Sequence, residues 1–393
     1  MVKIDLQNNP LPLGELGIIA LKSSEDLGDS VNKFIRKWRD REKNNDISLL
    51  IGEGYRKESY LLDAECPRFG TGEAKGTLKH SVRGKDIFLL VDVSNHSITY
   101  SMYGKENIMS PDDHFQDLKR VIAAIGGKAR RITVIMPFLY EGRQHKRSSR
   151  ESLDCALALQ ELVQMGVENI ITFDAHDPRV QNAIPLKSFE SAWPTYQFIK
   201  TLVNNIPNLI LDADHTMIVS PDEGAMSRSV YYANILGIDI GMFYKRRDYS
   251  VIVDGSNPII AHEFLGSDIK GKDVIVIDDM IASGGSIIDT AKELKKRNAG
   301  RIIVCATFGL FTSGLKVFDE AYEKGLIYRI ITTNLIYQSS EVLAKPYYIS
   351  ADMSKFIALL IDTLNHNASL SDLMKPDKKI QDFLHEKSSK SLQ

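Results

Sequence analysis

Short apolar runs typical of β-strands alternate with helix-like segments from about residue 85 to about residue 335. The strand-like runs are residues 86–93, 131–136, 169–173, 217–220 and 302–307. Between them, residues 152–165 place leucine and alanine at helical spacing. This order predicts an α/β fold, in which a mostly parallel sheet is flanked by helices. The alternation is too long for one small sheet, so we expect two α/β domains.

The domain boundary is expected near residues 188–194, after a run of loop residues. We predict an N-terminal domain over residues 1–190, a C-terminal domain over residues 191–345, and a helical segment with a polar tail over residues 346–393. In the less regular N-terminal region, the pattern of residues 31–43 predicts a charged amphipathic helix.

The composition is that of an ordinary globular protein, with 43% hydrophobic residues and 49 basic against 51 acidic side chains. This balance argues against nucleic acid as a partner. The three widely spaced cysteines predict neither a disulfide framework nor a zinc site, as is typical of the reducing cytoplasm. The sequence shows no signal peptide and no apolar run of membrane-spanning length. We therefore expect a cytoplasmic protein with neither a membrane nor a nucleic-acid partner.

The stretch VIVIDDMIASGGS, residues 274–286, leads from an apolar run into a helical pattern. After the apolar run come the paired acids Asp278 and Asp279, and then Ser283, Gly284, Gly285 and Ser286. The glycines, the serines and the positive end of the helix dipole favour a phosphate, whereas the paired carboxylates suit sugar hydroxyls or Mg²⁺. A phosphorylated sugar satisfies both halves of the motif. The alternative is a helix cap with a tight turn and two solvated aspartates.

Charged residues also follow two of the earlier strand-like runs. The loop 137–150 carries four basic residues: Arg143, Lys146, Arg147 and Arg150. Such a loop suits a polyphosphate, although a solvated charged loop is equally compatible with the pattern. Asp174 and His176 come directly after another strand, where they suit a divalent metal or a nucleotide phosphate. A structural histidine is the alternative for His176.

Two further clusters lie in the second half of the chain. Asp222 follows the strand-like run 217–220 and precedes a glycine. The segment YKRRD contains Lys245 and Arg247, and the residues that follow it up to Gly271 are expected to form a mobile loop.

Taken in order, these motifs resemble the ribose-phosphate pyrophosphokinase family over about residues 68–334. IDDMIASGGS resembles the family's ribose-5-phosphate loop, which all type I phosphoribosyltransferases share. RRITVIMPFLYEGRQHKR resembles its ATP-binding segment, which is specific to these synthases. The resemblance implies an α/β chain of two tandem type I phosphoribosyltransferase-like domains, each a mostly parallel sheet flanked by helices.

The activity implied by the resemblance is transfer of the pyrophosphoryl group of Mg-ATP to the anomeric hydroxyl of ribose 5-phosphate. The products are 5-phosphoribosyl 1-pyrophosphate (PRPP) and AMP. The resemblance also implies Mg²⁺, or Mn²⁺ in its place, and a homo-oligomer that is a hexamer or a dimer-based ring.

The resemblance assigns roles residue by residue. Lys245 and Arg247 are implied to be catalytic. The residues implied to bind ATP are Phe69, Glu73, Arg143, Gln144 and His176. The residues implied to bind ribose 5-phosphate are Asp278, Asp279, Ser283, Gly284, Gly285 and Ser286. The residues implied to lie at the metal are His176, Asp174 and Asp222.

The chain departs from the family's pattern at three positions. Thr71 stands where an acid or amide is expected, His145 where aspartate is usual, and Ala282 where the loop normally has aspartate. These departures keep open a non-catalytic regulatory subunit that associates with a synthase. A phosphoribosyltransferase that consumes PRPP is a second alternative, but it gives no reason to keep Arg143 and Gln144.

Overall fold

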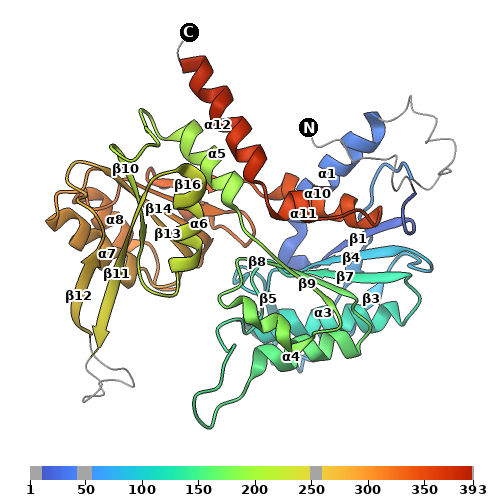
Figure 1. The fold of residues 1–393 in the computed structure, drawn as a ribbon. Coiled ribbons are helices and arrows are strands. Elements are labelled where there is room, and N and C mark those ends of the chain that lie inside the picture. The colour runs from blue at the N-terminus through green and yellow to red at the C-terminus, as the bar shows by residue number, and fades with distance from the viewer. Residues whose placement is uncertain (1–10, 42–54, 248–258, 392–393) are drawn as a thin grey trace. The chain divides into compact units, whose positions relative to one another are not determined.

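The computed structural model describes residues 11–41, 55–247 and 259–391 (Figure 1). By their contacts, these residues form two compact units. Unit 1 comprises Met1–Trp193, Asn334–Tyr337 and Asp352–Lys375, and unit 2 comprises Pro194–Thr333, Gln338–Ala351 and Pro376–Gln393. The C-terminal segment 346–393 is therefore divided between the two units rather than standing apart from both.

Within the described part of unit 1, a five-stranded sheet is parallel throughout. In spatial order its strands are β1 (Leu16–Ala20), β4 (Asp86–Leu90), β7 (Arg131–Ile135), β8 (Asn169–Phe173) and β9 (Ser188–Ala192). One face is covered by α3 (Pro111–Ile125) and α4 (Asp154–Gln164), and the other by α1 (Glu25–Arg41) and α10 (Ser354–Asn365) (Figure 1). Strand β4 is buried along its whole length, as a strand covered on both faces should be.

Local sequence explains where α3 begins and ends. Ser110 caps the helix in a capping box, because its hydroxyl accepts the N–H of Asp113 while the Asp113 carboxylate accepts the N–H of Ser110. Pro111 occupies the first turn, where its missing N–H costs nothing. Gly126 ends the helix in the left-handed conformation, with φ of 57°.

Unit 2, as far as its residues are described, contains a seven-stranded sheet that is parallel except for its first strand. In spatial order the strands are β12 (Ile259–Leu265), β11 (Asp239–Arg247), β10 (Thr216–Ser220), β13 (Asp273–Ile281), β14 (Ile302–Gly309), β15 (Arg329–Thr333) and β16 (Tyr348–Ala351). The helices are α5 (Thr195–Asn205), α6 (Met226–Leu236), α7 (Gly285–Lys296), α8 (Lys316–Glu323), α9 (Ser340–Leu343) and α12 (Asp377–Ser391).

The central strand β13 shows how unit 2 buries both faces of its sheet. Val274 and Val276 belong to the core that α7 and α8 cover, whereas Ile275 and Ile277 belong to the core that α5, α6 and α12 cover. This alternation follows from the period of two along a strand. It explains why the sequence reads as one continuous apolar run here.

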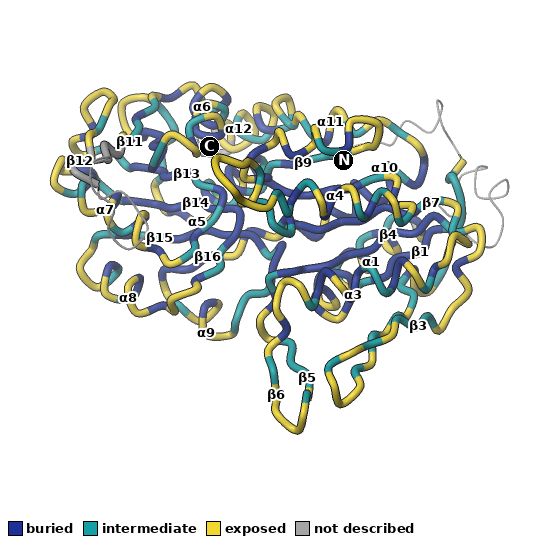
Figure 2. Tube along the Cα trace, turned by 90° about the horizontal axis from the view of Figure 1, so that it is seen from below, coloured by how far each residue is buried: buried dark blue, intermediate teal, exposed yellow. Residues whose placement is uncertain are grey.

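Short elements complete the described fold. Unit 1 also holds two small hairpins, β2 (Ala64–Glu65) with β3 (Thr77–Leu78) and β5 (Thr99–Met102) with β6 (Lys105–Ile108), all antiparallel. Its remaining short helices are η1 (Lys22–Ser24), η3 (Pro178–Ala183) and α11 (Ser371–Met374). Figure 2 shows the β5–β6 hairpin as a mostly exposed projection. No helix in the described ranges is both long and apolar enough to cross a membrane.

The predicted alternation of strands and helices is confirmed, but several individual elements differ from those expected. Residues 188–192, expected beside a loop-rich boundary, form the edge strand β9. The expected mobile loop after Arg247 contains strand β12, and its residues 248–258 lie outside the described residues. The polar tail forms a helix to Ser391, because Ile380 buries itself in the core of unit 2. The last two residues of the expected 31–43 helix also lie outside the described ranges.

Candidate functional site

The loop 282–286 of unit 2 joins the end of β13 to the start of α7. Gly284 adopts φ of 88°, and a Cβ there would lie 2.2 Å from the Phe318 ring. Only glycine therefore fits this position. Gly284 is also the N-cap of α7, and it offers no side-chain oxygen to the N–H groups of the first turn. The helix start is thus suited to an anion such as a phosphate.

The two aspartates lie on β13 itself, which continues past them to Ile281. Asp279 is 4% exposed, and its Oδ2 lies 3.8 Å from Nη2 of the buried Arg228 on α6. Asp278 is partly buried, and its Oδ1 accepts the backbone N–H of Asp279 at 2.8 Å. One carboxylate is thus paired with an arginine and the other is held by the backbone.

The surroundings of Asp278 make it the less easily ionised group. Burial first, and then the negative charges of Asp279 and Asp222, raise the pKa of Asp278 well above its usual value. Asp222 lies in the turn after β10, where its Oδ1 accepts the N–H groups of Gly224 at 3.0 Å and Ala225 at 3.2 Å. These hydrogen bonds fix the carboxylate near the end of β13. Acceptors so arranged suit the hydroxyls of a sugar.

Lys245 and Arg247 lie on the last residues of β11. Lys245 is opposite His262 and Arg247 is opposite Ile259, with a shift of register between Arg246 and Arg247. Their side chains lie outside the described part of the structure, so only their backbone positions are known. Both residues thus stand at the end of β11 that leads into residues 248–258.

In unit 1, the loop after β8 carries Asp174 and His176. Asp174 is buried with φ of 41°, and its N–H donates to the carbonyl of Ala192 at 2.9 Å. The N–H of Ala175 donates to the Ser191 hydroxyl at 3.0 Å. Strand β9 therefore fixes this loop, while the His176 side chain is exposed.

The segment that carries Arg143 and Gln144 reaches this loop through His145. His145 Nε2 lies 3.4 Å from Asp177 Oδ2, and its ring centroid lies 5.4 Å from that of His176. Hydrogen bonds from Arg179 hold the pKa of Asp177 at about 2, so Asp177 is ionised at neutral pH. Arg143 and Gln144 are exposed.

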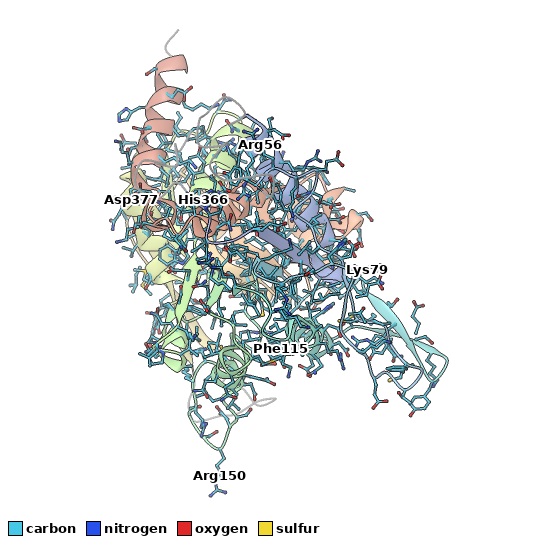
Figure 3. All side chains as sticks on the ribbon, turned by 90° about the vertical axis from the view of Figure 1, so that its right-hand side faces the viewer. Arg56, Lys79, Phe115, Arg150, His366 and Asp377 are labelled. Carbon is cyan, nitrogen blue, oxygen red and sulfur yellow. The ribbon has the colours of Figure 1, made fainter. Side chains whose placement is uncertain are left out.

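The basic loop continues beyond these residues. Figure 3 shows Arg150 pointing away from unit 1 at the outer end of this loop. The loop therefore presents its charge to solvent, where an incoming polyphosphate can reach it.

Phe69 and Glu73 lie on the loop between β2 and β3. The N–H of Phe69 donates to the Glu73 carbonyl at 2.7 Å, and the Thr71 hydroxyl donates to Glu73 Oε2 at 3.0 Å. The Phe69 ring is 54% exposed. Thr71, which departs from the family's pattern, therefore orients the carboxylate of Glu73.

No group of three or more His, Cys, Asp or Glu side chains is arranged to hold a metal within the ranges that the structure describes. Asp174 and His176 belong to unit 1, whereas Asp222 belongs to unit 2. One or two protein donors are enough for Mg²⁺ that arrives on a nucleotide, because this ion prefers phosphate oxygens and retained waters to an all-protein cage. The donors present therefore fit Mg²⁺ bound to a triphosphate.

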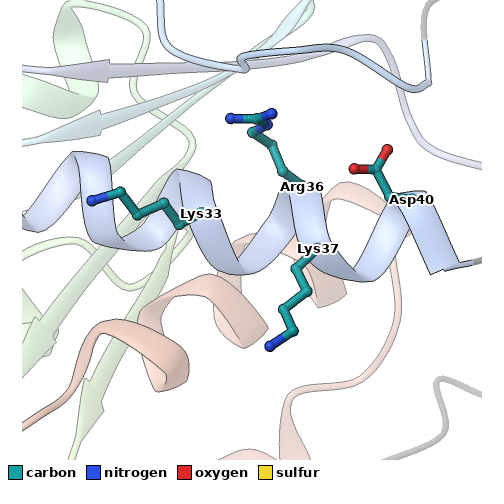
Figure 4. A pocket seen from close by; sticks show the side chains of 4 residues that line it. All are labelled: Lys33, Arg36, Lys37 and Asp40. Atoms are coloured by element: carbon teal, nitrogen blue, oxygen red, sulfur yellow. The ribbon is translucent and has the colours of Figure 1, made fainter.

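A hollow of about 370 Å³ lies on the exposed side of α1 and contains none of the predicted site residues (Figure 4). Its lining consists of Lys33, Arg36, Lys37 and Asp40. These residues are spaced as one face of a helix is, and their charges are typical of a solvated face.

Sequence reasoning missed three parts of the candidate site: the β5–β6 hairpin, Arg228 and Asp177. The hairpin had a signal, because Thr99 to Met102 is rich in strand-forming residues and Tyr103-Gly104 follows as a turn. Arg228 and Asp177 had none, since only the fold brings them to Asp279 and His145.

Comparison with known proteins agrees with this arrangement. Residues 16–166 match the N-terminal domain of ribose phosphate pyrophosphokinase, and residues 192–338 match the phosphoribosyl transferase domain. A ribose-phosphate pyrophosphokinase of Vibrio parahaemolyticus is 27% identical over 323 residues, which are 79% of this chain and 90% of that protein. The protein of the same name from Corynebacterium glutamicum is 28% identical over 348 residues, or 86% of this chain and 98% of that protein.

A solved structure supports the same fold. The phosphoribosylpyrophosphate synthetase from Mycobacterium smegmatis superposes with a TM-score of 0.68 at 22% identity, covering 90% of this chain and all of that one. Together the two domain matches span most of the sequence in the order expected. The chain therefore belongs to the ribose-phosphate pyrophosphokinase family of enzymes.

Proposed function

We propose that this chain transfers the pyrophosphoryl group of Mg-ATP to the anomeric hydroxyl of ribose 5-phosphate, giving PRPP and AMP. The observation that carries the proposal is the loop 282–286, in which a helix start shaped for a phosphate adjoins two carboxylates suited to sugar hydroxyls. The names of the chain's relatives support the same reaction.

In this reaction the sugar lies in unit 2. Ser283, Gly284, Gly285 and Ser286 bind the 5-phosphate, and Asp278 and Asp279 accept hydrogen bonds from ribose hydroxyls. Asp279 faces Arg228, whereas burial and the neighbouring carboxylates raise the pKa of Asp278. This arrangement fixes the attacking oxygen before the nucleotide reacts.

The nucleotide is held by residues of unit 1. Phe69 and Glu73 contact the adenine, while Arg143, Gln144 and His176 bind the phosphates. These side chains are exposed on three loops, as residues that close on an incoming ligand should be. Asp174, His176 and Asp222 are the proposed metal neighbours.

The chemistry then consists of one substitution at phosphorus. The anomeric oxygen forms a bond to the β-phosphorus of ATP, the bond from that phosphorus to the α–β bridging oxygen breaks, and AMP leaves with this oxygen. The hydroxyl proton passes to solvent. Lys245 and Arg247 stabilise the charge on the transferring group, because phosphoryl transfer depends mainly on positioning and charge neutralisation. Mg²⁺ bound to the triphosphate supplies further positive charge.

We also propose a homo-oligomer, either a hexamer or a dimer-based ring, as the resemblance implies. Two alternatives compete with the proposed reaction. A regulatory subunit without activity is favoured by Thr71, His145 and Ala282, which depart from the family's pattern. A phosphoribosyltransferase that consumes PRPP shares the Asp278 loop alone.

The test is a reaction of purified protein with ATP, ribose 5-phosphate and Mg²⁺, assayed for PRPP and AMP. We expect both products in equal amounts, with Mn²⁺ able to replace Mg²⁺ and excess EDTA abolishing turnover. Full turnover in EDTA would rule out this mechanism. An inactive protein that becomes active on Ala282→Asp substitution, or that only alters another synthase, would favour the regulatory subunit.

A further inference from the structure

The β5–β6 hairpin of unit 1 packs against the loop 68–74, which carries Phe69 and Glu73. Three separate contacts join the two segments. We propose that this hairpin is a positioning element, which holds the loop 68–74 in the shape that binds the nucleotide. The inference rests on the proposed function, because the contact of this loop with the adenine of ATP is part of that proposal.

The first contact is made by the hairpin's tip. The backbone N–H of Tyr103 donates to the carbonyl of Gly70 at 2.8 Å. Tyr103 and Gly104 both have positive φ, 49° and 73°, as in the tight turns that join antiparallel strands. The turn conformation therefore aims a backbone donor at the loop, whatever side chain residue 103 carries.

The second contact is a close approach at Gly72. This residue adopts φ of 92°, and a Cβ there would lie 2.7 Å from Met102 Sδ and 3.7 Å from the Tyr100 ring. The thioether of Met102 thus occupies the space beside the glycine. A loop that bends at Gly72 is backed by the side chains of β5, which limits the other conformations it can adopt.

The third contact is made by the partly buried Arg68 at the base of the loop. Its guanidinium carbon lies 4.8 Å from the centroid of the Tyr100 ring, and its Nη2 lies 3.0 Å from Asp117 Oδ2 on α3. Its Nη2 also lies 3.9 Å from Asp113 Oδ1, an atom that accepts the Tyr100 hydroxyl at 3.5 Å. Arg68 therefore joins the loop, the hairpin and α3 in one cluster.

These contacts leave the side chains of Phe69 and Glu73 accessible to a ligand. Phe69 is 54% exposed, and Glu73 is exposed with the Thr71 hydroxyl on one of its oxygens. A loop already held in its binding shape loses less conformational freedom when a ligand arrives, so the support should appear as affinity for the nucleotide.

The test compares Met102→Ala and Tyr100→Ala with the control Ile108→Ala. Ile108 lies on the same hairpin and is 63% exposed, away from these contacts. We expect the dissociation constant for ATP, measured by titration calorimetry, to rise about tenfold in the two test variants and to stay within about twofold in the control. The KM for ribose 5-phosphate and kcat should change by less than about twofold. Met102→Leu, which keeps the volume, should bind ATP like the wild type.

Unchanged ATP affinity in Met102→Ala and Tyr100→Ala would overturn the inference. Equal losses for ATP and ribose 5-phosphate would overturn it too, because a general disturbance of the fold gives that result. Calorimetry needs no turnover, so the inference and the proposed function can fail separately. If the wild type forms no PRPP but its ATP binding still weakens only in the test variants, the proposed reaction is wrong and the positioning role stands.

Discussion

The two halves of the candidate site are built differently. In unit 2, the sugar-phosphate residues lie at the end of β13, in the loop that follows it and in the first turn of α7. Asp279 and Arg228 are buried there, and Phe318 confines Gly284. In unit 1, the proposed nucleotide residues are exposed on three loops, two of which are joined by the contacts of His145 with Asp177 and His176. The sugar side is therefore shaped before any ligand arrives, whereas the nucleotide side depends on the support of its loops.

Because of this difference, mutations in the two units should affect different substrates and have different effects on stability. A change in the unit 2 cradle should affect ribose 5-phosphate and, where a buried group is involved, stability. A change in the unit 1 loops should affect ATP and leave the melting temperature unchanged, because exposed loop residues contribute little to the core.

The largest effect is expected from Lys245→Ala and Arg247→Ala, which belong to neither kind of ground-state site. Each should lower kcat by about a hundred- to a thousandfold, the typical loss when one preorganised charge is removed. ATP affinity should fall far less, and the melting temperature should barely move. Steady-state kinetics with a nucleotide titration measures both. Intact kcat with weakened ATP binding would show that these residues only bind the nucleotide.

The cradle is tested by Gly284→Ala beside its neighbour Gly285→Ala. Alanine at 284 meets both a positive φ and the Phe318 ring, so the KM for ribose 5-phosphate should rise about ten- to a hundredfold. At Gly285 the nearest outside atom to an added Cβ is Ser283 Oγ at 3.9 Å, and we expect a change of less than about threefold. Equal effects at the two positions would contradict a preformed cradle.

On the nucleotide side, Arg143→Ala should weaken ATP binding by about tenfold, the loss expected for one charge-assisted hydrogen bond. The KM for ribose 5-phosphate and the melting temperature should stay near wild type, because Arg143 is exposed. Lys146→Ala on the same loop is the matched control. A comparable loss of affinity for ribose 5-phosphate would break the division of roles between the two units.

A smaller change is expected when Ala282 is replaced by the aspartate that the family's loop normally has. Ala282→Asp should keep turnover within about tenfold and mainly alter the KM for ribose 5-phosphate. Its backbone carbonyl accepts the N–H of Thr312 at 3.0 Å, a bond that does not depend on the side chain. A strong gain in turnover would show that the natural chain lacks an essential carboxylate.

The smallest effect concerns stability and pH. Because the folded state raises the pKa of Asp278, the stability linked to this group is fully present below the ordinary aspartate pKa of about 4 and is lost as pH rises through the raised value. Asp278→Asn should therefore raise the melting temperature by roughly 2–4 °C at neutral pH, with the two curves converging near pH 4. Asp279→Asn should not raise the melting temperature, since it removes the negative charge that faces Arg228. If Asp278→Asn shifted the melting temperature equally at pH 7 and at pH 4, the raised pKa of Asp278 would be contradicted.

Local patterns predicted the parallel core strands well, because β4, β7, β8, β10, β13 and β14 are apolar runs whose burial leaves few alternatives. The same local patterns did not predict the strands β9 and β12, which lie at the edges of the two sheets. Strand β9 has a polar pattern and is a strand only because β8 pairs with it, and β12 owes its place to pairing with β11.

For the candidate site, the sequence predicted which loops follow which strands but not the contacts between distant residues. The 3.8 Å pair of Asp279 with Arg228, the approach of His145 to Asp177, and the packing of Met102 beside Gly72 all join segments that the fold alone brings together. Such contacts determine the charge and the shape of the site, and they cannot be predicted from the spacing of residues along the chain.

Attack of the sugar on the β-phosphorus of ATP can be followed with ATP that carries ¹⁸O at the α–β bridging oxygen. The labelled nucleotide is incubated with ribose 5-phosphate and the enzyme, and the products are analysed by mass spectrometry. We expect AMP to retain the label, PRPP to carry none, and no AMP to form without ribose 5-phosphate. Label in the diphosphate of the sugar product, or ADP in place of AMP, would contradict it.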